Sequence, residues 1–150
     1  MWVEWRMRVL EDVFRGEMPE YASELTQLSE ANEAFFRRNT LDGTLTSCFA
    51  LDANGHIAGC GASCTLQELP SPDNPSGLVA YFMNIYVVPD MRGHGIGRQI
   101  VDWLISDSEK RGIRRMMLET TDAARALYGA SGFRPASGYM IREELPADDR

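Results

Sequence analysis

The stretch of sequence that decides the fold is Ile85-Tyr86-Val87-Val88-Pro89-Asp90-Met91-Arg92-Gly93-His94-Gly95-Ile96-Gly97-Arg98. Its β-branched and aromatic start predicts a strand, which Pro89 ends because proline cannot donate to a sheet ladder. The glycines that follow lead into an apolar helical pattern, and glycine lets the backbone approach a ligand closely. Free N–H groups and the dipole at the start of a helix favour an anion. We therefore interpret residues 92–98 as a phosphate-binding loop.

The kind of phosphate ligand is narrowed by comparison with known loop patterns. A Walker-type loop requires Gly-Lys-Ser/Thr where the helix starts, and a dinucleotide pattern requires a glycine where Arg98 stands, so both patterns fail. The spacing that fits is Arg/Gln-x-x-Gly-x-Gly/Ala, here from Arg92 to Gly97. Arg92 and Arg98 flank the glycines and can add charge-assisted hydrogen bonds to phosphate oxygens.

The sequence on both sides of this stretch predicts an α/β (α+β) fold with a mixed sheet covered by helices. The Asn54-Gly55 turn makes the first pair of strands antiparallel, whereas later strand–helix–strand units require right-handed crossovers. A proline-rich stretch at 67–77 predicts an exposed loop. In chain order we expect helices at 2–14 and about 20–38, strands at 44–51, 56–66 and 78–88, a helix at 95–111, a strand at 114–121, a short helix at 123–131 with Asp122 as its N-cap, and a strand at 139–143.

A second motif lies about 30 residues beyond the loop and reads Leu127-Tyr128-Gly129-Ala130-Ser131-Gly132-Phe133. Together the two motifs resemble the GCN5-related N-acetyltransferase (GNAT) superfamily, in which Leu-Tyr-x-x-x-Gly-Phe follows the glycine-rich motif at this spacing. The resemblance covers residues 44–141 in element order. It implies a mostly antiparallel mixed sheet that splays open beside the strand at 78–88.

The resemblance also implies acetyl-CoA as the cofactor, bound mainly by the main chain. The backbone of Ile85, Tyr86 and Val87 would bond the pantetheine arm, since an exposed strand edge offers unpaired N–H and C=O groups. The residues implied for the pyrophosphate are Arg92, Gly93, His94, Gly95, Ile96, Gly97 and Arg98.

The reaction that the resemblance implies is direct attack of a neutral amine on the thioester. It needs a base for the amine, a proton donor for the leaving sulfur and stabilisation of the oxyanion. Tyr128 matches the family tyrosine that acts as general acid near the sulfur, and its alternative role is to pack a helix against the sheet. Glu119 resembles the glutamate that some members use as base, and the alternatives are a solvated surface charge and a chain of water molecules.

Composition sets further limits on the class of protein. The 150 residues carry a formal net charge of −7, which fits one domain over residues 1–150 and disfavours a general nucleic-acid binder. No apolar run approaches the ~20 residues that cross a bilayer, and the N-terminus lacks a secretion signal, so we expect a cytoplasmic protein without a membrane partner. The three cysteines, Cys48, Cys60 and Cys64, form no metal-binding pattern, so we expect reduced thiols and no metal site.

The function predicted from these observations is transfer of an acetyl group from acetyl-CoA to a primary amine of a small molecule or peptide. The alternative is a catalytically silent GNAT-like module that binds acyl-CoA as a sensor. The net acidity points to a cationic acceptor. Because the helical pattern starts at Trp2, the strand that usually opens GNAT chains is expected to be missing, and a second copy could cover the exposed sheet edge in a homodimer.

Overall fold

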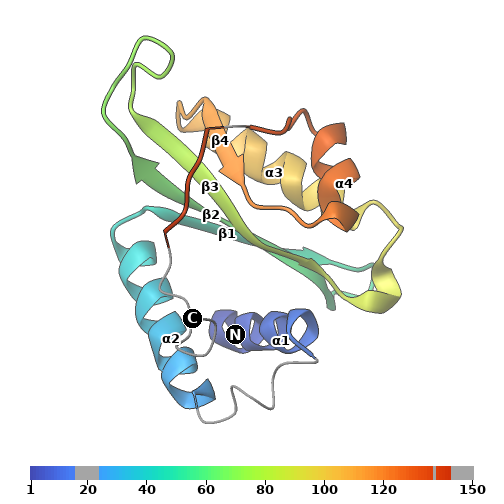
Figure 1. The fold of residues 1–150 in the computed structure, drawn as a ribbon. Coiled ribbons are helices and arrows are strands. Elements are labelled where there is room, and N and C mark those ends of the chain that lie inside the picture. The colour runs from blue at the N-terminus through green and yellow to red at the C-terminus, as the bar shows by residue number, and fades with distance from the viewer. Residues whose placement is uncertain (16–23, 137, 143–150) are drawn as a thin grey trace, which may run out of the picture.

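The fold has three layers, and it is described from a computed structural model for residues 1–15, 24–136 and 138–142. Its elements are α1 (Trp2–Val13), α2 (Leu25–Leu41), β1 (Leu45–Leu51), β2 (Ile57–Gln67), β3 (Leu78–Val87), the 3₁₀ turn η1 (Pro89–Met91), α3 (Ile96–Lys110), β4 (Arg115–Leu118), the 3₁₀ turn η2 (Asp122–Ala124) and α4 (Arg125–Ala130). Figure 1 shows the sheet between α1 and α2 on one face and α3 and α4 on the other. The described residues include no helix that is long and apolar enough to cross a membrane.

The sheet has the strand order β1-β2-β3-β4, in which the first two pairs are antiparallel and β3 runs parallel to β4. The β1–β2 turn is fixed by the Asp52 carboxylate, which accepts hydrogen bonds from the N–H groups of Asn54 and His56 at 2.8 and 2.9 Å. The chain crosses from β3 to β4 through α3. The predicted mixed fold class and both connections are therefore confirmed.

The core between the sheet and α3 fixes the position of α3 on the sheet. Ile100, Val101 and Leu104 of α3 pack with Ala80 and Phe82 of β3, and all five are almost fully buried. β2 contributes small residues at this contact, and a Cβ atom at Gly61 would lie 2.4 Å from Ile100 Cγ2. This close packing fixes the start of α3 against the end of β3.

Aromatic residues of α1 cover the opposite face of the sheet. Trp2 stacks on Phe49 of β1 with ring centroids 3.9 Å apart, and Trp5 meets the same ring edge-on at 6.0 Å. Val9 packs with Cys60 and Tyr86. The two tryptophans thus pack within the chain. Among the described residues no strand pairs with the outer side of β1, so β1 is the edge of this sheet, as predicted.

Four of the predicted elements differ in the structure. α2 ends at Leu41, three residues after the predicted end. β4 ends at Leu118, three residues before the predicted end. Asp122 does not cap α4, because it starts a 3₁₀ turn and accepts a hydrogen bond from Arg125 at 2.9 Å. Residues 138–142 form no strand where one was expected at 139–143, and residue 143 lies outside the described residues, as do residues 20–23 of the predicted second helix.

Candidate active site

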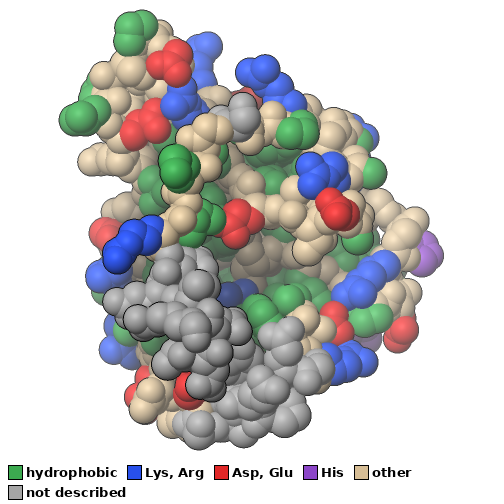
Figure 2. Space-filling view, in the orientation of Figure 1, with side chains coloured by type: hydrophobic (Ala, Val, Ile, Leu, Met, Phe, Trp, Pro, Cys, Tyr) green, Lys and Arg blue, Asp and Glu red, His purple; other side chains and the backbone are tan. Residues whose placement is uncertain are grey.

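The sheet opens between β3 and β4. These strands pair only from Val79–Arg115 to Phe82–Leu118, whereas β3 continues to Val87. The pairing of β3 with β2 is also irregular here, opposite Cys60 to Ala62, and Asn84 has a φ of 55° that non-glycine residues rarely adopt. Figure 2 shows the molecule hollowed at the middle of this face. We call the gap beyond Phe82 the β3–β4 opening.

Two residues of β3 direct their backbone groups toward this opening. The N–H of Val88 donates to the Ala58 carbonyl of β2 at 3.0 Å. Since successive residues of a strand direct their backbone groups to opposite edges, Tyr86 also bonds toward β2, where its partner is Cys60. Ile85 and Val87 therefore face the opening. Of the three residues expected to bond the pantetheine arm, Tyr86 has its main chain turned away.

The phosphate-binding loop presents a row of backbone donors. Gly93 and Gly95 have φ values of 80° and 79°, a conformation that favours glycine, and Gly95 precedes α3 without any side-chain cap. Within the described part of the chain, no carbonyl accepts from the N–H groups of residues 93–98. The loop is exposed or half-exposed. These accessible, unpaired donors at the start of a helix fit a pyrophosphate.

The guanidinium of Arg92 is held beside this loop by contacts with two other elements. Its Nε donates to the Val87 carbonyl at 2.9 Å, and its Nη2 donates to a carboxylate oxygen of Asp12 in α1 at 2.8 Å. It also lies 5.5 Å from the centre of the Tyr86 ring. The hydrogen bond from Arg92 lowers the pKa of Asp12. Sequence reasoning missed Asp12, because no motif connects it to the loop.

The side chains of His94 and Arg98 form hydrogen bonds with nearby protein groups. His94 Nδ1 donates to the Arg92 carbonyl at 2.9 Å, and carbonyl acceptance fixes the proton on that nitrogen. The imidazole therefore stabilises the conformation of the loop. Arg98 Nε donates to Asp102 at 3.3 Å, and Asp102 also accepts from the Ser131 hydroxyl at 2.8 Å. Arg98 stays exposed on the first turn of α3.

Tyr128 lies in α4 on the α3 side of the sheet. Its ring is 9% exposed and meets Phe133 edge-on at 6.1 Å within the core that includes Phe82. Burial raises the pKa of Tyr128 above its ordinary value of 10.0. Its hydroxyl has no hydrogen-bonding partner among the described residues. The residue thus packs the helix against the sheet and also keeps a protonated hydroxyl.

Glu119 follows directly after β4, at the mouth of the β3–β4 opening. Ala80 and Phe82 pack toward α3, so the alternation of β3 places Tyr81 on the α1 side of the sheet. Burial, followed by the nearby Glu119 carboxylate, raises the pKa of Tyr81. Glu119 therefore lies beside the Tyr81 hydroxyl. The candidate base and the candidate acid occupy opposite faces of the sheet.

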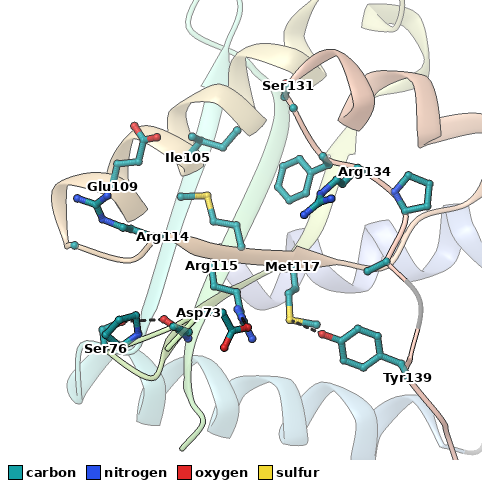
Figure 3. Close-up of a pocket in the computed structure, with 18 of the residues that line it drawn as sticks. Asp73, Ser76, Ile105, Glu109, Arg114, Arg115, Met117, Ser131, Arg134 and Tyr139 are labelled. Atoms are coloured by element: carbon teal, nitrogen blue, oxygen red, sulfur yellow. Dashed lines mark hydrogen bonds and ion pairs between the residues drawn. The ribbon is translucent and has the colours of Figure 1, made fainter. Parts of the chain in front are cut away.

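A separate cleft of about 1320 Å³ follows the outer edge of β4 (Figure 3). Arg115 spans it by donating to Glu68 at 2.8 Å and by pairing with Asp73, while the Tyr139 hydroxyl meets the Met117 sulfur at 3.4 Å. None of the predicted site residues lines this cleft.

Residues 7–133, which include the phosphate-binding loop, the β3–β4 opening and Tyr128, match the acetyltransferase (GNAT) family. The chain belongs to the GNAT family. The recognition made from the two motifs is confirmed, and so are the class of enzyme, an acetyl-CoA-dependent acyltransferase, and its cofactor.

Relatives of this GNAT protein act on different amines. It is 27% identical to a glucosamine 6-phosphate N-acetyltransferase of Trypanosoma brucei brucei over 138 residues, which cover 88% of this chain and 90% of the relative. Over 73 residues it is 41% identical to the ribosomal protein bS18-alanine N-acetyltransferase of Escherichia coli K12, covering 47% of this chain and 48% of that protein.

Solved structures share the fold of this GNAT protein. A GCN5-related N-acetyltransferase of Ralstonia eutropha JMP134 has a TM-score of 0.77 at 22% identity, covering 94% of this chain and 92% of that one. An acetyltransferase of Clostridium acetobutylicum, solved with acetyl-CoA, has a TM-score of 0.72 at 23% identity, covering 82% and 77%. The α1–α2, sheet and α3–α4 layers are thus those of the family.

Proposed function

We propose that this GNAT protein transfers the acetyl group of acetyl-CoA to the primary amine of a small molecule or a peptide. The observation that carries the proposal is the continuity between the open edge of β3 and the unpaired backbone donors of residues 93–98. An extended, amide-bearing arm can follow such an edge as an added strand. The diphosphate at the end of that arm then meets the start of α3.

Within this proposal the cofactor is held mainly by backbone groups. The backbone of Ile85 and the N–H of Val87, whose carbonyl accepts from Arg92, bond the arm. The N–H groups of Gly93, His94, Gly95, Ile96, Gly97 and Arg98 bind the pyrophosphate. Arg92 and Arg98 add positive charge at the same place. When bound, acetyl-CoA supplies an acetyl group that is activated as a thioester.

The protons of the reaction move through two residues that flank the β3–β4 opening. Glu119, on the α1 side, accepts a proton from the acceptor ammonium and so frees its lone pair for attack on the thioester. As the C–N bond forms and the C–S bond breaks, Tyr128, on the α3 side, donates its proton to the departing sulfur. The second proton of the attacking nitrogen passes to water, and water reprotonates Tyr128. The raised pKa of Tyr128 supports this assignment, because an acid must be protonated when it is used.

The test measures thiol release from acetyl-CoA over a panel of amines, alongside calorimetric binding of acetyl-CoA. The panel includes glucosamine 6-phosphate and a peptide that begins with alanine, because relatives act on acceptors of these kinds. We expect Tyr128→Phe to lower kcat roughly 100-fold while acetyl-CoA binding is kept. Tyr139→Phe is the matched control, since Tyr139 lies in the outer cleft of β4.

The alternative function is the acyl-CoA sensor. Acetyl-CoA binding without thiol release from any amine would support that alternative and contradict the enzyme proposal. An unchanged kcat in Tyr128→Phe would remove Tyr128 from the mechanism.

We also infer that two copies of the chain associate through the outer edge of β1. Among the described residues no strand pairs with that edge, and an unpaired edge favours strand addition from another chain. Light scattering at micromolar concentration tests this inference, and a monomer would contradict it. The cytoplasmic location remains a prediction from the sequence.

A further inference from the structure

Arg6 of α1 is a half-buried cation that, among the described residues, forms a side-chain hydrogen bond only with a neutral group. Its Nη1 donates to the Asn84 side-chain oxygen at 3.0 Å. Burial lowers the pKa of the Arg6 guanidinium. Among the described residues it forms no ion pair with a carboxylate.

Other arginines of the chain do not share this combination. One group pairs with carboxylates, and it consists of Arg15, Arg37, Arg92, Arg98, Arg111, Arg115 and Arg125. A second group lacks such a partner but is exposed to water, and it consists of Arg8, Arg38, Arg114, Arg134 and Arg142. Within the described residues, Arg6 alone is both shielded from water and without an anion. A charge in that position is unfavourable unless an opposite charge joins it.

The place where Arg6 meets the sheet is the start of the β3–β4 opening. Its partner Asn84 is the residue with a φ of 55°, between Met83 and Ile85. α1 lies on the same face of the sheet as Tyr81 and Glu119. Figure 2 shows a hollow between the α1–α2 layer and the α3–α4 layer. Arg6, through Asn84, and the candidate base, through Tyr81, thus lie on the same face of the sheet beside the β3–β4 opening.

We propose that Arg6 binds an anionic group, a carboxylate or a phosphate, carried by the amine acceptor. The inference rests on the proposed acetyl transfer and names its substrate class. Asn84 occupies one Nη1 donor, which leaves the Nε and Nη2 hydrogens for a bidentate contact with the anion.

The dimensions of the site and its charge add two features of the acceptor. Tyr81, beside the candidate base, and Asn84, beside Arg6, are three residues apart on β3, or about 10 Å along a strand, which a small molecule that carries both an amine and an anion can span. The acidic net charge of the chain points to a cationic acceptor, whereas the opening carries one charge of each sign, on Glu119 and on Arg6, which suits an acceptor with both an amine and an anion. The local charges decide, because charges separated by more than about 10 Å are screened by salt.

The test compares acceptors that differ only in the anion. The pairs are glucosamine 6-phosphate with glucosamine, and alanine with alaninamide, each titrated calorimetrically into protein saturated with CoA. We expect the anionic member of one pair to bind roughly 10- to 100-fold more tightly, and that pair identifies the anion as phosphate or carboxylate. Arg6→Gln abolishes the difference without changing acetyl-CoA affinity, whereas Arg6→Lys keeps part of it.

Arg8→Gln is the matched control, because Arg8 lies on the same helix but is exposed and stacks on Trp5 at 4.9 Å. The melting temperature separates binding from folding: an unpaired half-buried charge contributes no stability, so Arg6→Gln should melt at or above the wild-type temperature. A much lower melting temperature, with equal losses for both members of a pair, would overturn the inference.

Absence of any preference for the anionic member would overturn it as well, and so would a preference that survives in Arg6→Gln. Because the titration needs no turnover, it separates this inference from the proposed function. Anion-dependent binding without thiol release would keep the Arg6 site and contradict the acetyl transfer.

Discussion

Asp12 of α1 and Arg92 of the phosphate-binding loop form an ion pair of 2.8 Å, although they lie 80 residues apart in the sequence. The same guanidinium bonds the Val87 carbonyl and lies over the Tyr86 ring. One edge of the guanidinium is therefore used by protein groups, and its Nη1 hydrogens remain for a ligand. Through this pair, the first helix is attached to the loop that receives the cofactor.

Asp12→Asn is expected to weaken acetyl-CoA binding roughly three- to tenfold, because Arg92 loses the charge that orients it. The KM for acetyl-CoA should rise while kcat and the KM for the amine stay unchanged, since Asp12 is a positioning residue. Steady-state kinetics and calorimetry check this. Glu33→Gln serves as control, because it removes an exposed ion pair of α2 with Arg37. Tighter binding in Asp12→Asn would mean that the carboxylate competes with phosphate for Arg92.

Gly95→Ala is expected to lower the free energy of unfolding by about 1 to 2 kcal/mol. The space beside Gly95 is open, so the cost comes from its φ of 79° alone. A shift of this backbone also turns the donors of the first α3 turn, and acetyl-CoA binding should weaken roughly tenfold. Urea unfolding and calorimetry measure the two effects.

Gly129→Ala is the matched control for this substitution. Gly129 lies in α4, also has open space around it and has no positive φ, so alanine should leave stability unchanged or raise it by up to about 1 kcal/mol. If Gly95→Ala and Gly129→Ala changed the free energy of unfolding equally, the cost at Gly95 could not come from its positive φ.

The parts of the site that could be predicted from the sequence are those made by neighbouring residues. The strand end, the glycines and the start of α3 follow one another in the chain, so local preferences place them. The Arg6–Asn84 and Asp12–Arg92 contacts are set by the packing of α1 on the sheet, which no local pattern encodes.

The orientation of the β3 main chain depends on an irregularity in strand pairing that no sequence motif predicts. The irregular pairing at Asn84 decides which of Ile85, Tyr86 and Val87 face the opening, and asparagine in that conformation carries no distinctive motif. β4 is shorter than the strand predicted at 114–121 because strand length depends on a partner, and β3 pairs with β4 only as far as Phe82.

The pH dependence of kcat tests the role of Tyr128. Burial raises the pKa of Tyr128 above 10.0, and a general acid works only while it is protonated. We therefore expect no loss of kcat that is due to Tyr128 between about pH 8 and pH 10. Any decline should lie above that range and be absent from the residual activity of Tyr128→Phe. A decline centred near pH 8 that disappears in this variant would contradict the buried position of the hydroxyl.

The buried thiols should make the fold less stable at high pH. Burial raises the pKa of Cys48 and of Cys60 from 9.0 to about 11. Between these values the unfolded chain loses protons that the folded chain keeps, so stability is full below pH 9 and falls as the pH rises toward 11. The fully buried Cys60 should account for about 2 kcal/mol of that loss, and the half-buried Cys48 for less because water screens it.

Urea unfolding at pH 8, 9 and 10 measures this slope, and the variant with both Cys48→Ala and Cys60→Ala should show a shallower one. The comparison stops at about pH 10 because buried tyrosines titrate above it. Thiol reagents give a second measurement: Cys60 is fully buried, so its modification should follow unfolding and accelerate in urea. Rapid modification of Cys60 in the native protein would show that α1 leaves the sheet more readily than its packing on Tyr86 implies.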